Sequence, residues 1–142
     1  MNAPQTSWMQ AWGLVPLRIV LGVVFLMHAW QKLFVFGVAG TADILDKLGI
    51  PLATAAALLL IVVESAGGVA ILLGYFTRTA AALLVIEMCV AIPVARFSGG
   101  FFAPSGYEFE AVLLGACATL ALAGPGVTSL ESWLAGRRGS AA

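Results

Sequence analysis

Four long apolar segments, separated by short polar stretches, dominate the chain. They cover about residues 16–36, 52–74, 78–96 and 108–124. A helix needs roughly 20 residues to cross the hydrocarbon core of a bilayer, with about 17 as the lower limit, which the last segment barely reaches. Because lipid offers no hydrogen bonds to the backbone, such segments cross it as helices. The pattern therefore predicts an all-α protein, a transmembrane four-helix bundle in which residues 1–142 form a single membrane domain.

Proline and glycine mark the expected ends of these helices. Pro16 and Pro51 are expected in the first turns of the first and second helices, where a backbone N–H lacks a partner anyway. Gly74 and Gly124 are expected to close the second and fourth helices. Pro93 lies inside the third segment and should kink that helix or end it early.

Two shorter segments have the pattern of helices that lie in the membrane interface. Residues 41–48 place their apolar side chains on one helical face, and Gly49 offers a C-cap. Residues 128–131, Thr-Ser-Leu-Glu, resemble a capping box, and Trp133 would lie at headgroup depth. We therefore expect two short interfacial helices, and a disordered tail over residues 136–142.

The composition supports a lipid environment. Hydrophobic residues make up 61% of the 142 residues and charged residues only 10%, whereas soluble domains contain about 25% charged residues. The formal net charge is zero, so nothing points to nucleic acid. Residues 1–13 contain no Lys or Arg, so the first apolar segment is expected to be a retained helix and not a signal peptide.

The orientation is weakly encoded by the basic residues. With four spans both termini lie on one side, which would hold Arg18, Arg78, Arg137 and Arg138. The opposite side would hold Lys32, Lys47 and Arg96. The positive-inside rule therefore favours cytoplasmic termini by one residue.

Two carboxylic acids fall near the middle of apolar segments and need an explanation. A charge at the bilayer centre costs about 2.5–3.5 kcal/mol on insertion scales. Glu64 and Glu87 should therefore both point into the bundle, and either could be protonated. One interpretation is that they only hold helices together through hydrogen bonds or ion pairs, and the other is a ligand or proton-relay role. Antiparallel packing favours His28, or a water molecule beside it, as the partner of Glu64.

Further polar and aromatic residues gather in the half of the bundle away from the termini. This end would hold Lys32, Arg96, Tyr107, Glu108 and Glu110, with aromatic walls from Phe97, Phe101 and Phe102. Such a pocket would suit a quinone headgroup, which needs donors for its carbonyl oxygens and rings for stacking. Alternatively, the two basic side chains extend to the interface and one of the acids pairs with them. The candidate cofactor-binding residues are His28, Lys32, Glu64, Glu87, Arg96 and Glu108.

Other cofactors have no support in the sequence. A single histidine with scattered carboxylates gives no metal spacing, so neither a metal site nor haem held by two histidines is expected. Cys89 and Cys117 lie inside apolar segments and are expected to be small buried residues. We find no phosphate-binding loop and no nucleophile–histidine–acid arrangement. Any redox chemistry would therefore belong to a bound cofactor or a partner chain.

Four sequence blocks, spread from about Pro16 to Leu130, resemble the DoxX family of small four-helix membrane proteins. The first reads Arg18-x-x-Leu-Gly-x-x-Phe-x-x-His28-x-x-Gln-Lys32, and the second reads Glu64-x-x-Gly-Gly68 followed by Gly74 and Thr-Arg78. The third reads Gly-Phe-Phe-Ala-Pro-Ser-Gly-Tyr-Glu108, and the last is Gly-Pro-Gly126 followed by Ser-Leu130. Two acids compete for the position of the family's acid in the fourth helix, and Glu108 is favoured over Glu110 because it follows Gly-Tyr.

The resemblance implies a membrane function without defining it. Its family name is tied to a membrane subunit of a thiosulfate:quinone oxidoreductase, so it implies at most a subunit of a quinone-dependent enzyme in the bacterial inner membrane. The partners would then be lipid, other membrane or redox proteins, and a possible second copy. Distant relatives resemble assembly chaperones, which leaves a non-enzymatic scaffold or assembly factor as the alternative. A transporter or channel formed by oligomers lacks any repeat or filter pattern.

Overall fold

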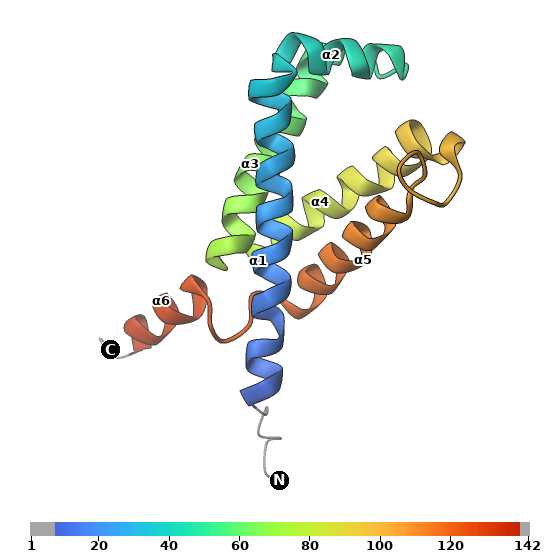
Figure 1. Ribbon diagram of the computed structural model, residues 1–142. Helices are drawn as coiled ribbons and strands as arrows, with labels where there is room; N and C mark the ends of the chain where they lie inside the picture. The colour runs from blue at the N-terminus through green and yellow to red at the C-terminus, as the bar shows by residue number, and fades with distance from the viewer. Residues whose placement is uncertain (1–7, 140–142) are drawn as a thin grey trace.

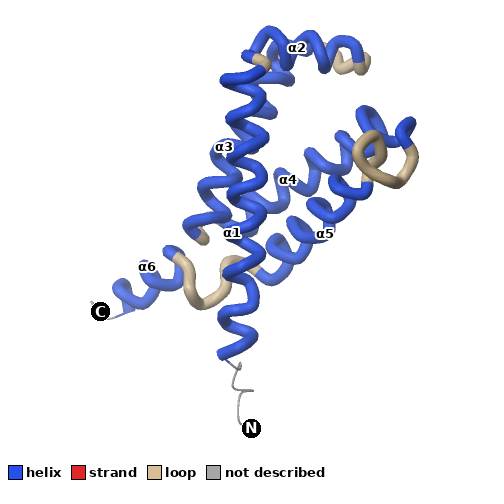
Figure 2. Tube along the Cα trace, in the orientation of Figure 1, coloured by secondary structure: helices blue, strands red, loops and turns tan. Residues whose placement is uncertain are grey.

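The computed structural model describes residues 8–139 and is helical throughout, with short connections (Figures 1 and 2). The prediction of an all-α protein is confirmed. The elements in chain order are α1 (Trp8–Trp30), η1 (Gln31–Val35), α2 (Gly37–Lys47), α3 (Ala53–Leu73), α4 (Thr77–Ala91), η2 (Ile92–Arg96), η3 (Phe97–Gly99), α5 (Glu108–Ala123) and α6 (Leu130–Gly139). The elements η1 and η2 are π-helical turns that continue α1 and α4, and η3 is a 3₁₀ turn.

The long helices pack as two antiparallel pairs. The helices α1 and α3 lie side by side, and α4 and α5 form a second pair that is inclined to the first (Figure 1). The short helix α2 lies across one end of the first pair and packs on α3, while α6 projects from the other end (Figure 1). The core between the pairs consists of Leu21, Phe25, Ile71, Ala80, Ala81, Leu84, Met88, Leu113, Cys117 and Leu120.

The outer surface of the helices is apolar, as a bilayer requires. Exposed side chains include Leu59 on α3, Val112 and Leu122 on α5 and Phe34 on η1, the last three being 68%, 80% and 69% exposed. Within residues 8–139, three segments are long and apolar enough to cross a membrane: Trp12–Val35, Ala53–Leu73 and Thr77–Gly99. The expected fourth span corresponds to α5, which has only 16 residues. The expected range, about residues 108–124, agrees with α5 to within one residue.

Several expected helix ends are confirmed and others are corrected. Gly74 and Gly124 follow α3 and α5 with φ of +68° and +84°, where L side chains are strained. The helix α4 ends at Ala91, just before Pro93, as expected. Pro16, however, lies inside α1, which begins at Trp8. The helix continues through this residue, so Pro16 is no start signal.

The C-terminal helix differs from the expectation in two ways. Its capping box is formed by Ser129 and Ser132 and not by residues 128 and 131. The backbone N–H of each serine donates to the hydroxyl of the other, both at 3.1 Å. The helix continues to Gly139, so residues 136–139, expected to be disordered, are helical. Residues 140–142 of that expected tail lie outside the described residues.

Candidate functional site

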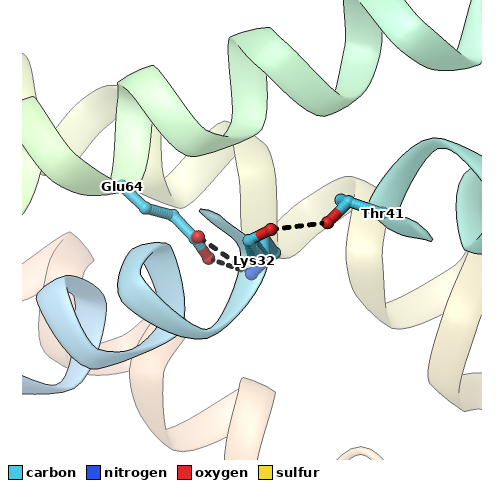
Figure 3. A network of polar contacts seen from close by, with 3 residues as sticks. All are labelled: Lys32, Thr41 and Glu64. Atoms are coloured by element: carbon cyan, nitrogen blue, oxygen red, sulfur yellow. Dashed lines mark hydrogen bonds and ion pairs between the residues drawn. The ribbon is translucent and has the colours of Figure 1, made fainter. Parts of the chain in front are cut away.

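An ion pair between Lys32 and Glu64 joins α1 to α3 inside the bundle. The Lys32 Nζ atom donates to both carboxylate oxygens of Glu64, at 2.7 and 2.8 Å (Figure 3). The side chain of Glu64 is 4% exposed and that of Lys32 is 21% exposed. The prediction that Glu64 points inward and meets a polar group of the first helix is confirmed. Its partner is Lys32, however, and not His28.

The backbone around Lys32 explains why this side chain turns inward. Helical side chains point back towards the N-terminus of their helix, so the long stem of Lys32 can reach down α1 towards Glu64. Lys32 lies in the π-helical turn η1, and the Thr41 hydroxyl from α2 donates to the Lys32 carbonyl oxygen at 3.1 Å (Figure 3). Thr41 is buried. The alternative in which Lys32 extends outward to the interface is therefore wrong.

Two glycines allow α1 and α3 to approach closely enough for this pair. A Cβ atom added at Gly22 would lie 2.3 Å from Leu72 Cγ and 2.9 Å from the Gly68 carbonyl oxygen. One added at Gly68 would lie 2.8 Å from Leu26 Cγ and 3.0 Å from the Gly22 carbonyl oxygen. Gly68 is one helical turn from Glu64, so the contact between the two glycines holds the acid against α1.

The second midplane acid, Glu87, lies beside Glu64. It comes from α4, its carboxyl group lies within hydrogen-bonding range of the Glu64 carboxyl, and it also senses the charge of Lys32. Its Oε2 atom is buried and receives no N–H or O–H bond from the described residues. The prediction that Glu87 faces the interior is confirmed, because a buried carboxyl oxygen cannot face lipid.

The other basic residue of this end, Arg96, pairs with Glu110. Arg96 lies in the π-helical turn η2, and its Nε donates to Glu110 Oε1 at 2.8 Å. Glu110 is buried, on the face of α5 that packs towards the core. Glu108, favoured from the sequence as the acid of this helix, instead accepts a hydrogen bond from the Ala103 N–H at 2.9 Å. Glu108 therefore stabilises the loop before α5 and makes no hydrogen bond or ion pair with the other candidate residues in the described part of the chain.

A groove lies between the end of α1 and the start of α5. Its volume is about 360 Å³, and its lining includes His28 and Gln31 among apolar side chains that include Met27, Trp30 and Phe109. The rings of His28 and Phe109 lie 5.9 Å apart. The expected aromatic walls were wrong, because Phe97, Phe101 and Phe102 line none of this groove and instead cluster around Tyr107 and one another.

The groove borders the charged groups described above. His28 experiences the charges of Lys32, Glu64, Glu110 and Arg96, which places both ion pairs in its neighbourhood. Five of the six predicted site residues therefore belong to one region, and Glu108 is the exception. Trp30 and Phe109 also line the groove, although neither was predicted from the sequence to belong to the pocket. A signal for Phe109 was available, since it follows Glu108 at the predicted helix start.

Two arginines at the opposite end stabilise helix termini and have a structural role. Arg18, only 4% exposed, donates to the carbonyl oxygens of Ile71 and Leu72 at the end of α3. It also donates to those of Pro125 and Thr128 after α5. Arg78 binds the last carbonyls of α5 from Ala121 to Ala123. A cation is favourable at these sites because helix C-termini carry unpaired carbonyls and partial negative charge.

The fold and these two ion pairs between helices define a small multi-pass membrane protein built from two helix pairs. The DoxX family model matches residues 13–97, more than half of the chain, and the chain belongs to this family. The match covers α1 to η2, and thus Lys32, Glu64, Glu87 and Arg96, but not Glu110.

Similar proteins are described as membrane proteins. The inner membrane protein YphA of Escherichia coli is 28% identical over 120 residues, covering 80% of this chain and 84% of its own. The inner membrane protein YqjF of the same organism is 27% identical, covering 86% and 92%. An uncharacterized membrane protein of Mycobacterium tuberculosis is 35% identical, covering 67% and 60%. No solved structure matches the chain.

Proposed function

We propose that this protein is a membrane component of a quinone-linked oxidoreductase or redox-stress system, and that it binds a quinone headgroup in the groove beside His28. The observation that carries the proposal is the groove itself, with two polar side chains among aromatic and aliphatic ones. Ligand sites usually combine mostly apolar walls with a few polar groups that fix the orientation.

The lining offers what a quinone ring and its two carbonyl oxygens need. His28 and Gln31 each carry an N–H group that can donate to a carbonyl oxygen. Phe109 and Trp30 provide ring surfaces, and the groove lies on apolar helices, where an isoprenoid tail would be soluble in the surrounding lipid. Lys32 and Arg96 are already paired with acids, so they would set the charge around the headgroup and would not donate to it directly.

Electron transfer would depend on a partner. The side chains of the groove and its neighbours can bind and can exchange protons, but none of them carries electrons between substrates. On this proposal the chain is at most one subunit of an enzyme and holds the quinone for a redox partner.

Quantification of bound quinone tests the proposal. The protein, extracted gently from its own membranes, should retain quinone at close to one molecule per chain. The double variant His28→Leu with Gln31→Leu should lose most of it, because both donors are removed. Thr119→Val is the matched control, since this exposed hydroxyl on α5 bonds only to the Gly115 carbonyl oxygen of its own helix. Quinone-free preparations, or equal retention in the double variant, would contradict the proposal.

A non-enzymatic scaffold or assembly factor is the second candidate, and one observation favours it. Lys32 and Arg96, the two basic residues near the groove, each form an ion pair with an acid of the same chain. Such pairs can serve only to hold the helices together. The same purification distinguishes the two functions. A scaffold should co-purify stoichiometrically with another membrane protein and carry no quinone, and Leu substitutions at exposed Ala55 or Ala66 on α3 should abolish that association.

A further inference from the structure

The acids inside the bundle outnumber the cations that can neutralise them. Among the described residues, one region of the bundle holds three carboxyl groups, Glu64, Glu87 and Glu110, and two cations, Lys32 and Arg96. Arg96 pairs with Glu110 and Lys32 pairs with Glu64, which leaves Glu87 without a cation of its own among the described residues. A net negative charge at this depth would cost several kcal/mol unless something neutralises it.

The neighbours of Glu87 on every packed element leave few ways to neutralise it. The turn η1 contributes Lys32, and α3 contributes Glu64. The helix α5 contributes Cys117, which is fully buried and experiences the charge of Glu87. Lys32 carries a single positive charge and donates to both oxygens of Glu64, so it can balance the charge of only one of the two carboxylates.

The contact between the two carboxyl groups has a simple chemical consequence. Ionised carboxylates only accept hydrogen bonds, so two of them in contact repel each other. The contact becomes a hydrogen bond once one of the acids carries a proton. Both oxygens of Glu64 already accept from Lys32, whereas Glu87 Oε2 receives no donor. The proton therefore belongs on Glu87, from which it is donated to Glu64.

We infer that Glu64 and Glu87 form a proton-binding site inside the membrane, in which one proton is held between the two carboxyl groups against the Lys32 ammonium. With this proton the five groups, three acids and two cations, are neutral as a set. The inference does not require quinone binding. His28, which lines the groove, experiences the charge of Glu64, so the site would act electrostatically on a ligand bound there.

Infrared spectroscopy of the purified protein without added quinone tests this site. The wild type should show the carbonyl stretch of a protonated carboxylic acid near neutral pH, and the band should shift on exchange into D₂O. Glu87→Gln should remove it. Lys32→Met should add a second band, because Glu64 then lacks its cation and takes a proton. Glu108→Gln is the control, since that acid starts α5, binds the Ala103 N–H of the preceding loop and should leave the band unchanged.

A second measurement uses the wild-type protein and so does not depend on a variant folding. A hydrophobic carbodiimide reacts with protonated carboxyl groups in apolar surroundings, and mass spectrometry then locates the adduct. We expect modification at Glu87 and none at Glu110 or Glu108. A carboxylic-acid band that persists in Glu87→Gln, no such band in the wild type, or an unmodified Glu87 would each overturn the inference. A small metal cation in place of the proton would show as a missing band.

Discussion

At the scale of single residues, the orientation of Lys32 decides the character of the site. A lysine near a helix end in a membrane usually extends its ammonium group towards the headgroups. Here the ammonium group reaches inward and donates to both oxygens of a nearly fully buried acid. Removing one partner of a buried pair is more damaging than neutralising both, because it leaves the other group without compensation.

Lys32→Met should lower the free energy of unfolding by about 3 kcal/mol, because it leaves Glu64 without its cation. We expect the lower end of the range for a broken buried pair because the Lys32 side chain is 21% exposed. The double variant Lys32→Met with Glu64→Gln should recover part of this loss, since it removes both charges. Thermal unfolding of the protein in a mild detergent measures the effect.

Lys47→Met provides the control for this experiment. Lys47 is exposed at the end of α2, so its replacement should change stability by less than about 0.5 kcal/mol. If Lys32→Met unfolded at the same temperature as Lys47→Met, the pair would contribute nothing to stability.

At the scale of helices, both basic residues near the groove lie in π-helical turns. Lys32 lies in η1 at the end of α1, and Arg96 lies in η2 at the end of α4. A π-helical turn takes an extra residue, which changes the direction of the side chains relative to a continuous α-helix, and such turns are frequent at functional sites. Both turns present a cation to an acid of a neighbouring helix.

The close approach of α1 and α3 gives the second stability prediction. Gly68→Ala should destabilise the protein by about 1–3 kcal/mol, because its Cβ would lie 2.8 Å from Leu26 Cγ and 3.0 Å from the Gly22 carbonyl oxygen. It should also weaken the Lys32–Glu64 pair one turn away. The unfolding temperature in detergent measures the first effect.

Gly115→Ala is the matched control for the helix contact. A Cβ atom at Gly115 on α5 would meet nothing within 4 Å. Gly115→Ala should therefore change stability only through the higher helix propensity of alanine, which would raise the free energy of unfolding by up to about 1 kcal/mol. Equal unfolding temperatures for the two alanine variants would show that the contact between α1 and α3 is not tight.

At the scale of the whole molecule, the number of membrane crossings depends on α5. Its 16 residues rise about 24 Å, less than a hydrocarbon core of about 30 Å. Its two ends nevertheless lie at opposite ends of the bundle. Glu110 meets Arg96 beside the groove, whereas Pro125 and Thr128, which follow the helix, bind Arg18 in the first half of α1. The chain therefore returns to the end at which α1 begins.

We therefore expect α5 to cross the membrane, through a locally thinned bilayer, so that both ends of the chain lie on the same side. The positive-inside rule predicts that this side is the cytoplasm. Green fluorescent protein fused after residue 139 should fluoresce, and alkaline phosphatase should be active when fused after Ser105 but inactive when fused after Val127. If α5 does not cross, the two phosphatase fusions will give the same result. Three crossings would then place the chain ends on opposite sides.

The sequence alone determined the helical class, the approximate helix ranges and most helix ends, because these follow from local features. A run of apolar residues predicts a membrane-spanning helix from its own sequence. Gly74, which tolerates positive φ, and Pro93, which interrupts backbone hydrogen bonding, each affect only the few residues around them. The same local rules identified Glu64 and Glu87 as acids that must face inward.

Only the tertiary structure decided which groups meet. Lys32 and His28 lie one turn apart on the same side of α1, so helix periodicity could not choose between them as the partner of Glu64, 32 residues beyond Lys32. The sequence favoured Glu108 over Glu110 as the acid of this helix, whereas the packing of α5 on α4 places Glu110 against Arg96. Arg18 binds carbonyls up to 110 residues away, a contact that depends on how the helices pack and on no local pattern.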